Sequence, residues 1–124
     1  MRRFLYLFLI YFVCLACQQS GTTIITAEEL KQKQQEGTQV VDIRTKNEFD
    51  SGHIPGALHI DYSQPDFAKR MEALGKETPI IIHCAKGGRS GRAMSILKEA
   101  GFVNVYDYSG GFSDWKQRGE KIEK

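Results

Sequence analysis

Cys84 is the residue of this 124-residue chain best placed to do chemistry. It follows an apolar run, Pro79 to His83, and opens a short loop with the sequence Cys84-Ala85-Lys86-Gly87-Gly88-Arg89-Ser90. A buried strand before the thiol would carry the sulfur to the carboxyl edge of a sheet. The glycines allow successive backbone N–H groups to turn inward, and a helix that starts in the loop adds its positive dipole end. Cys84 is therefore a candidate nucleophile in a cradle that stabilises anions.

The same loop predicts that the Cys84 thiol ionises readily. Inward-facing N–H groups favour the thiolate, and Lys86 and Arg89 add positive charge, so the pKa of Cys84 should lie below the value of about 8.5 for a free cysteine. Both cations could attract an anionic substrate, or could instead face solvent or pair with acids elsewhere. Most free cysteines are small buried hydrophobes, so the prediction depends on the loop and not on the thiol alone.

The elements that must position this loop lie within residues 23–124, which are enough for one domain and too few for two. Helices are expected at residues 27–35, 65–74, 90–100 and from near 111 onward, the first with a capping box formed by Thr26 and Glu29. Strands are expected at residues 23–25, 39–43, 57–60, 79–83 and 103–106. This alternation predicts an α/β fold: a small doubly wound parallel sheet, covered by helices on both faces, that binds ligands at the carboxyl ends of its strands.

The beginning of the chain indicates where the thiol works. Arg2 and Arg3 precede an apolar stretch from Phe4 to Ala16, and polar residues follow Cys17, so residues 1–16 are predicted to be an export signal. The stretch is shorter than the ~20 residues of a membrane-spanning helix. The sequence Cys14-Leu15-Ala16-Cys17 resembles the bacterial lipoprotein signal, although Cys14 stands where that signal usually has Leu. The resemblance implies cleavage before Cys17, acylation of Cys17, a tether at residues 17–22, and a domain held by lipid on the periplasmic side of a bacterial membrane.

Charge and cysteine content narrow the classes of function. Without Arg2 and Arg3 the number of Lys and Arg falls from 17 to 15, equal to the 15 Asp and Glu, so the domain lacks the basic stripe of a nucleic-acid-binding protein. Cys84 would be the one free thiol of the processed chain, and an unpaired cysteine in an exported protein points to a functional thiol. The histidines do not have the spacing of a metal site, so we expect no metal. We also expect a domain that uses no cofactor and is monomeric.

Three segments resemble the rhodanese family of sulfurtransferases. The first runs from Val41-Asp42-Ile43-Arg44 through Glu48-Phe49 to Gly52-His53-Ile54-Pro55-Gly56-Ala57, the second is the Cys84 loop, and the third is Ser109-Gly110-Gly111-Phe112 with Trp115 and Gly119. The resemblance implies that Cys84 takes the outer, sulfane sulfur from a donor such as thiosulfate and releases sulfite. The resulting Cys84 persulfide would pass its sulfur to a thiophilic acceptor, cyanide or a thiol. Ala85, Lys86, Gly87, Gly88, Arg89 and Ser90 would then bind the substrate.

Four residues outside the loop are expected to support it rather than to react. Asp42 and Arg44 flank the end of a buried strand, and an ion pair between Arg44 and Glu48 would tie that strand to the next turn. His53 could be mistaken for a general base, but a thiolate stabilised by its loop needs none, and in the resembled family this histidine is mainly structural. Trp115 is expected to close the core.

Other uses of such a thiol stay open. Cysteine-dependent phosphatases and arsenate reductases bind their anion in a similar cradle, but their motif places five residues between Cys and Arg, whereas four separate Cys84 from Arg89. A module that relays sulfane sulfur between partners, or senses thiols without turnover, would have the same loop. It would be distinguished from an enzyme by its poor activity with small sulfur donors. A redox role is disfavoured because residues 23–124 contain no second cysteine to resolve a disulfide.

Overall fold

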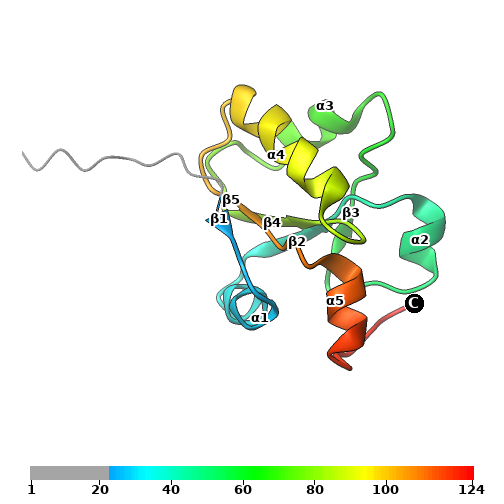
Figure 1. Ribbon diagram of the computed structural model, residues 1–124. Helices are drawn as coiled ribbons and strands as arrows, with labels where there is room; N and C mark the ends of the chain where they lie inside the picture. Colours follow the sequence, from blue (N-terminus) through cyan, green and yellow to red (C-terminus); the bar gives the residue numbers. More distant parts are fainter. Residues whose placement is uncertain (1–22) are drawn as a thin grey trace, which may run out of the picture.

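The computed structural model describes residues 23–124 (Figure 1). The predicted export signal, the tether and Cys17 lie outside the described residues. Within residues 23–124, no helix is long and apolar enough to cross a membrane.

A parallel sheet of five strands, in the order β1-β5-β4-β2-β3, forms the centre of the domain. The strands are β1 (Thr23–Ile24), β2 (Gln39–Asp42), β3 (Leu58–His59), β4 (Ile80–His83) and β5 (Val105–Asp107). All four residues of β4 are buried, as befits a central parallel strand covered on both faces. The predicted doubly wound α/β fold is confirmed. Cys84 directly follows β4 and therefore lies at the carboxyl edge of the sheet.

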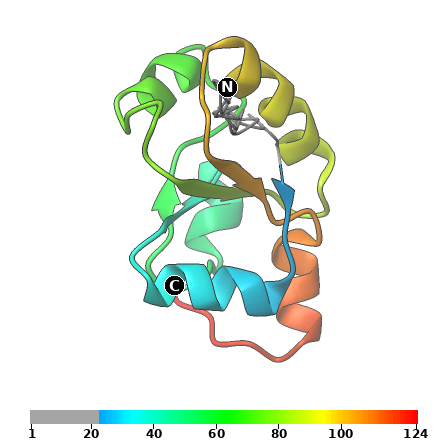
Figure 2. The ribbon, with the colours of Figure 1, turned by 90° about the vertical axis from the view of Figure 1, so that its left-hand side faces the viewer.

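Helices cover both faces of this sheet (Figures 1 and 2). One face packs against α3 (Phe67–Glu72) and α4 (Gly88–Glu99), which contribute Phe67, Met71, Ala93, Met94 and Leu97 to one buried cluster. The opposite face packs against α1 (Ala27–Gln35) and α5 (Gly111–Gln117), whose Ala27, Leu30, Phe112 and Trp115 belong to a second cluster. Trp115 is buried, so the prediction that it closes the core is confirmed.

Capping residues fix two helix starts. Thr26 and Glu29 make both bonds of the predicted capping box at the start of α1. A second box, formed by Thr45 and Glu48, starts the short helix α2 (Lys46–Asp50), where the sequence analysis expects only a turn. The Thr-x-x-Glu spacing was a readable signal for this helix, which follows β2 at the carboxyl edge of the sheet.

Candidate active site around Cys84

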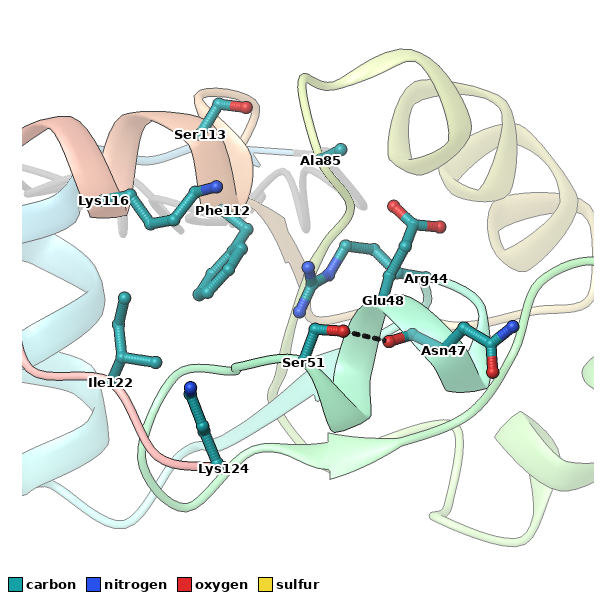
Figure 3. A pocket seen from close by; sticks show the side chains of 10 residues that line it. All are labelled: Arg44, Asn47, Glu48, Ser51, Ala85, Phe112, Ser113, Lys116, Ile122 and Lys124. Carbon is teal, nitrogen blue, oxygen red and sulfur yellow. Dashed lines mark hydrogen bonds between the residues drawn. The ribbon is translucent and has the colours of Figure 1, made fainter.

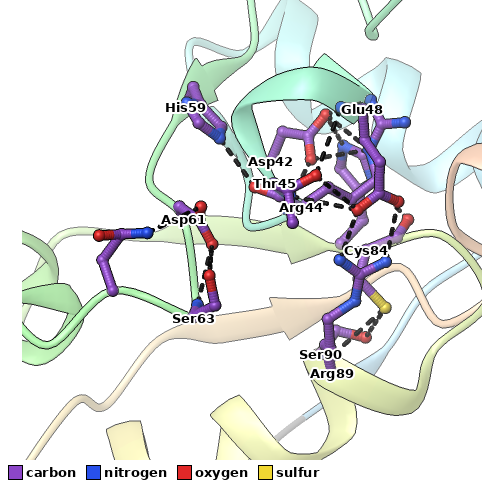
Figure 4. Close-up of polar contacts among 12 residues, drawn as sticks. Asp42, Arg44, Thr45, Glu48, His59, Asp61, Ser63, Cys84, Arg89 and Ser90 are labelled. Carbon is purple, nitrogen blue, oxygen red and sulfur yellow. Dashed lines mark hydrogen bonds and ion pairs between the residues drawn. The ribbon is translucent and has the colours of Figure 1, made fainter.

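Cys84 lies at the carboxyl end of β4 with its sulfur enclosed by the loop that follows (Figure 4). The residue is 1% exposed. Its Sγ accepts backbone N–H bonds from Gly87, at 3.2 Å, and from Ser90, at 3.4 Å, and lies 3.7 Å from the Ser90 hydroxyl oxygen. Donors thus converge on the sulfur from the loop and from the first turn of α4, as the sequence predicts.

These donors determine how easily the thiol ionises. Burial alone would raise the pKa of Cys84, but the N–H and hydroxyl of Ser90 and the N–H groups of Lys86 and Gly87 stabilise the thiolate and bring the pKa below its ordinary value. The predicted direction is therefore confirmed. The main cause is hydrogen bonding from the loop, rather than the lysine and arginine charges that the sequence also suggested.

Glycines allow the loop to close against α5. Gly87 has φ 96°, and a Cβ atom there would lie 2.6 Å from the Ser109 carbonyl oxygen. A Cβ atom on Gly111 would lie 2.6 Å from the carbonyl oxygen of Cys84, which accepts the Phe112 N–H at 2.9 Å. The segment around Gly111 therefore holds the backbone of the active loop in place, a role that the sequence analysis does not assign to it.

Arg89 faces an acid rather than open solvent. Its guanidinium binds Glu48 through two bonds, of 2.8 and 3.0 Å, and this pair lies beside Cys84 (Figure 4). Hydrogen bonding from Arg89 is the largest cause that lowers the pKa of Glu48 to about 2. Arg89 is thus neutralised by Glu48 of α2, and Lys86 is the loop cation whose side chain is exposed.

The predicted ion pair between Arg44 and Glu48 is wrong. Arg44 instead binds the carboxylate of Asp42, with the shortest N–O distance 2.7 Å, and donates to the Gly52 carbonyl oxygen at 2.8 Å. Asp42 and Arg44 are two residues apart along one strand direction, so their side chains share a face and both are buried. The pair of Asp42 and Arg44 ties β2 to the turn before His53. Arg44 thus has the supporting role that was expected of it, with Asp42 as its partner in place of Glu48.

The histidines of this region have structural contacts. His53 stacks on Phe49 with ring centroids 3.9 Å apart, and its Nδ1 lies 3.1 Å from the Phe49 carbonyl oxygen. His83 is fully buried below the loop, where its Nδ1 lies 3.0 Å from the carbonyl oxygen of Cys84. Neither ring has a recorded bond to the Cys84 sulfur. Residues 23–124 contain no group of three or more His, Cys, Asp or Glu side chains that could hold a metal ion.

Asp107, at the end of β5, is a site residue that sequence reasoning missed. Its side chain is buried behind the loop, and one carboxylate oxygen, Oδ1, has no hydrogen-bond partner. Burial raises the pKa of Asp107, and the neighbouring Ser90 hydroxyl only partly offsets this. The signal was an acid directly after an apolar strand segment, one position beyond the predicted end of that strand.

An open groove of about 780 Å³ lies beside the loop (Figure 3). Helix α2 and its end line one side, α5 and the last residues of the chain line the other, and Ala85 joins them. The lining residues are Arg44, Asn47, Glu48, Ser51, Ala85, Phe112, Ser113, Lys116, Ile122 and Lys124. Most of these residues are far apart in sequence, and no local motif predicted the groove.

Fold and site together define a class: a parallel α/β domain that presents a cysteine of lowered pKa inside a loop of backbone donors. Comparison with known families agrees, because residues 26–118 match the model of the rhodanese-like domain. The chain therefore belongs to the rhodanese-like family, as the three sequence segments predicted.

Individual relatives support this assignment. The chain is 38% identical over 93 residues to the thiosulfate sulfurtransferase GlpE of Pseudomonas aeruginosa, which covers 74% of this chain and 82% of that protein. It is 34% identical over 109 residues to the protein YqhL of Bacillus subtilis, covering 87% of this chain and 84% of that one. Among solved structures, the rhodanese-like domain of the Anabaena protein Alr3790 superposes with a TM-score of 0.73 at 27% identity, over 83% of this chain and 80% of that one.

Proposed function

We propose that this protein is a sulfurtransferase that carries sulfane sulfur on Cys84. The observation that carries the proposal is the enclosure of the Cys84 sulfur by N–H donors of Gly87 and Ser90 at 3.2 and 3.4 Å. The similarity to a thiosulfate sulfurtransferase makes thiosulfate the first donor to test.

In the first step the Cys84 thiolate attacks the outer sulfur of thiosulfate. A new S–S bond forms, the bond between the two sulfur atoms of thiosulfate breaks, and sulfite leaves with the electron pair. The product is a Cys84 persulfide anion, so charge and electrons balance without an oxidant. Donors that are already in place around the sulfur stabilise the developing anion without reorganisation, which is often the largest contribution to catalysis.

In the second step a nucleophilic acceptor attacks the outer sulfur of the persulfide. Cyanide would leave as thiocyanate, and a thiolate would leave as a new persulfide. Cys84 departs as a thiolate into the same donor cradle, which makes it a good leaving group and restores the starting state. Each donor is therefore used twice in a turnover.

The position of Arg89 disfavours phosphatase action. A phosphate-binding arginine must direct its guanidinium to the anion above the cysteine, where paired N–H groups contact the phosphate oxygens. Here the Arg89 guanidinium is bound by both oxygens of Glu48. We expect no hydrolysis of p-nitrophenyl phosphate by the protein that accepts sulfur from thiosulfate.

Intact-mass measurement after incubation with thiosulfate tests the proposal, with sulfite release followed in parallel. We expect a gain of one sulfur atom that cyanide or dithiothreitol reverses, and no gain in the Cys84→Ser variant. A folded wild-type protein with neither adduct nor sulfite would overturn thiosulfate as the donor. Transfer only in the presence of a partner protein would favour the relay function instead.

We also propose that the chain is exported and held on the periplasmic side of a bacterial membrane by acylation of Cys17. The support is the positive start, the apolar stretch and the small residue before Cys17. Fractionation of expressing cells tests this proposal: the wild-type protein should be recovered with membranes and released by detergent, and the Cys17→Ser variant should lack the acyl mass. Equal fractionation and no acyl mass on the wild-type protein would overturn it.

A further inference from the structure

We propose that Asp107 is a positioning residue for Cys84: the protonation state of its carboxyl group decides whether the Ser90 hydroxyl donates to the sulfur or is drawn away from it. The inference is carried by the placement of the three side chains on one face of the sheet, by the burial of Asp107 and by the single proton of the Ser90 hydroxyl. It concerns the ionisation of Cys84, and its consequence for sulfur uptake rests on the proposed function.

The sheet places Cys84 and Asp107 on the same face. Side chains alternate along a strand, and Asp107 pairs with Ile82, two residues before Cys84. Ile82 and Cys84 both belong to the buried cluster that packs against α3 and α4, and Asp107 lines a small pocket together with residues of α4. Ser90, which is fully buried in the first turn of α4, therefore lies where it can bond to both the thiol and the carboxyl group.

The Ser90 hydroxyl has more possible acceptors than protons. Its Oγ donates to the Gly87 carbonyl oxygen at 3.3 Å and lies 3.7 Å from the Cys84 sulfur (Figure 4). The Asp107 carboxyl group is also close enough to Ser90 for the hydroxyl to favour its ionised form. A hydroxyl rotates to suit its surroundings but has one proton to donate, and ionised acceptors form the stronger bonds. The charge on Asp107 therefore determines which acceptor receives that proton.

The surroundings of Asp107 favour a change between its two forms. The residue is only 5% exposed, and its Oδ1 has no hydrogen-bond partner. A buried carboxylate with an unpaired oxygen is costly, whereas the protonated group is neutral and gains a donor. Burial accordingly raises the pKa of Asp107, so this group loses its charge closer to neutral pH than an exposed aspartate does.

The two forms of Asp107 act on the thiol in opposite ways. The ionised carboxylate accepts the Ser90 proton, withdraws it from the sulfur and adds a negative charge on the same side of the sheet. The neutral acid donates its own proton to the Ser90 oxygen, which leaves Ser90 free to donate to the Cys84 thiolate. Protonation of Asp107 therefore lowers the pKa of Cys84. As the pH falls through the raised pKa of Asp107, Cys84 keeps more thiolate than it would beside a permanently ionised carboxylate.

Other ionisable groups near this chain of side chains are paired or face elsewhere. On β4, His83 alternates to the opposite face of the sheet, where its ring lies against an aromatic side chain of the second cluster. On α4, Arg89 is bound to Glu48, and Lys98 lines the same pocket as Asp107 without an ion pair to it within residues 23–124. Strand β1 contributes only an apolar side chain to that pocket. Ser90 is therefore the polar connection between the carboxyl group and the thiol.

The pH dependence of Cys84 alkylation by iodoacetamide tests this inference in the full-length protein, with the modified Cys84 peptide quantified by mass spectrometry so that other cysteines do not contribute. Asp107→Asn is neutral at every pH, and its amide can donate to Ser90. Asp107→Ala removes the competing acceptor without replacing it. Asp61→Asn is the matched control, because Asp61 is also a buried acid, and its serine partner, Ser63, has no recorded bond to the thiol.

We expect Asp107→Asn to shift the alkylation profile to lower pH, with the acid dissociation constant of Cys84 raised by about threefold to tenfold, the effect of one hydrogen bond. Asp107→Ala should shift the profile in the same direction, and Asp61→Asn should follow wild type. In a Ser90→Ala background the shift caused by Asp107→Asn should be less than half as large, because the hydroxyl that transmits it is absent.

Profiles of Asp107→Asn and Asp107→Ala that coincide with wild type, or that move to higher pH, would overturn the inference. An equal shift in the Ser90→Ala background would also overturn it, because the carboxylate charge would then act without the hydroxyl. Thiosulfate uptake by the same proteins separates this result from the proposed function. A shifted alkylation profile in a protein that takes up no sulfur overturns thiosulfate as the donor and leaves the role of Asp107. Normal uptake with an unshifted profile overturns the role of Asp107 alone.

Discussion

At the scale of single residues, Ser90 contributes most to the ionisation of Cys84, because it supplies both a backbone N–H and a hydroxyl. Replacing Ser90 with Ala removes only the hydroxyl and keeps the backbone donors of Ser90 and Gly87. We expect the pKa of Cys84 to rise by the equivalent of one hydrogen bond of about 1 kcal/mol, so that the acid dissociation constant falls by a factor of about three to ten. The pH dependence of alkylation by iodoacetamide measures this directly.

The matched control for Ser90→Ala is Ser95→Ala in the middle of α4, an exposed serine with no recorded side-chain bond to the thiol. Its alkylation profile should coincide with that of wild type. If the Ser90→Ala profile also coincides with wild type, the backbone donors alone determine the pKa of Cys84, and the assigned role of the hydroxyl is wrong.

Asp107 offers a second prediction at this scale, because its carboxyl group is buried with one oxygen unpaired. Burial raises its pKa above the ordinary 3.8, so the folded state binds a proton more tightly than the unfolded state does. Binding of this proton stabilises the folded state below about pH 3.8, the ordinary pKa of the group. The stabilisation is lost as the pH rises through the raised pKa of Asp107 in the folded state. Asp107→Asn should therefore become more stable relative to wild type as the pH rises, by about 1 kcal/mol near pH 7.

Urea unfolding of wild type and Asp107→Asn between pH 4 and pH 8 tests the sign of this effect. The exposed Asp66, which makes no capping bond at the start of α3, provides the control Asp66→Asn. That variant should follow the wild-type pH dependence. A difference between Asp107→Asn and wild type that stays constant with pH, or shrinks as the pH rises, would contradict the raised pKa.

Whether a contact between two residues could be predicted from the sequence depended on how far apart the two residues lie along the chain. The donors around Cys84 lie within six residues of it, so the loop sequence was enough to predict the cradle and the direction of the pKa shift. Glu48 reaches Arg89 across 41 residues, and no local pattern distinguishes that partner from Arg44 four residues away. The error arose because Arg44 is buried beside Asp42 on the same strand face, where an outward reach to α2 would leave Asp42 unpaired.

At the scale of elements, the pair between Glu48 and Arg89 joins α2 to the first turn of α4. Glu48→Gln removes the charge, while the amide oxygen can still complete the capping box with Thr45. The side chains of the pair are 35% and 26% exposed, so screening limits the expected loss to about 1 kcal/mol at neutral pH. Because the pKa of Glu48 is lowered from 4.5 to about 2, this stabilisation is present above about pH 4.5 and is lost as the pH falls towards 2.

Chemical unfolding of wild type and Glu48→Gln at pH 7 and at pH 3 tests this prediction, because the difference between them should shrink at the lower pH. Lys46→Gln, which removes the exposed pair of Lys46 with Asp50 in the same helix, is the control and should cost much less. A Glu48→Gln variant as stable as wild type at pH 7 would show that the pair does not hold α2 against the loop.

Strands and helices were predicted correctly where an apolar run or a recognised capping box marks them. The very short helix α2 was not predicted. Strand β4 and helix α4 were expected nearly as they occur, although α4 begins two residues before its predicted start because Gly87 adopts a positive φ and caps it. The five-residue α2 has no apolar face to reveal it, and only its capping box marks it. That helix carries Glu48 and one wall of the groove, so overlooking it also concealed the groove.

At the scale of the whole molecule, residues 121–124 complete the groove by returning to the turn after α2. His53 and Glu123 exchange two backbone bonds, of 2.8 and 3.0 Å, in an antiparallel bridge. The buried Trp115 donates its Nε1–H to the Lys121 carbonyl oxygen at 2.9 Å. These contacts join the final residues to both α5 and the turn after α2, and sequence alone gave no indication of them because the segment is short, polar and without periodicity.

Deleting residues 121–124 should therefore destabilise the domain without unfolding it. The deletion removes the two bonds with His53 and leaves the buried Trp115 donor unpaired, a loss of about 2 to 3 kcal/mol at roughly 1 kcal/mol for each bond. The parallel sheet and both buried clusters stay intact, so urea unfolding should remain a single transition at lower urea. Deleting Lys124 alone, which has no recorded hydrogen bond, is the matched control and should leave the midpoint unchanged. Equal midpoints for the two truncations would show that the bridge to His53 is not a stabilising part of the fold.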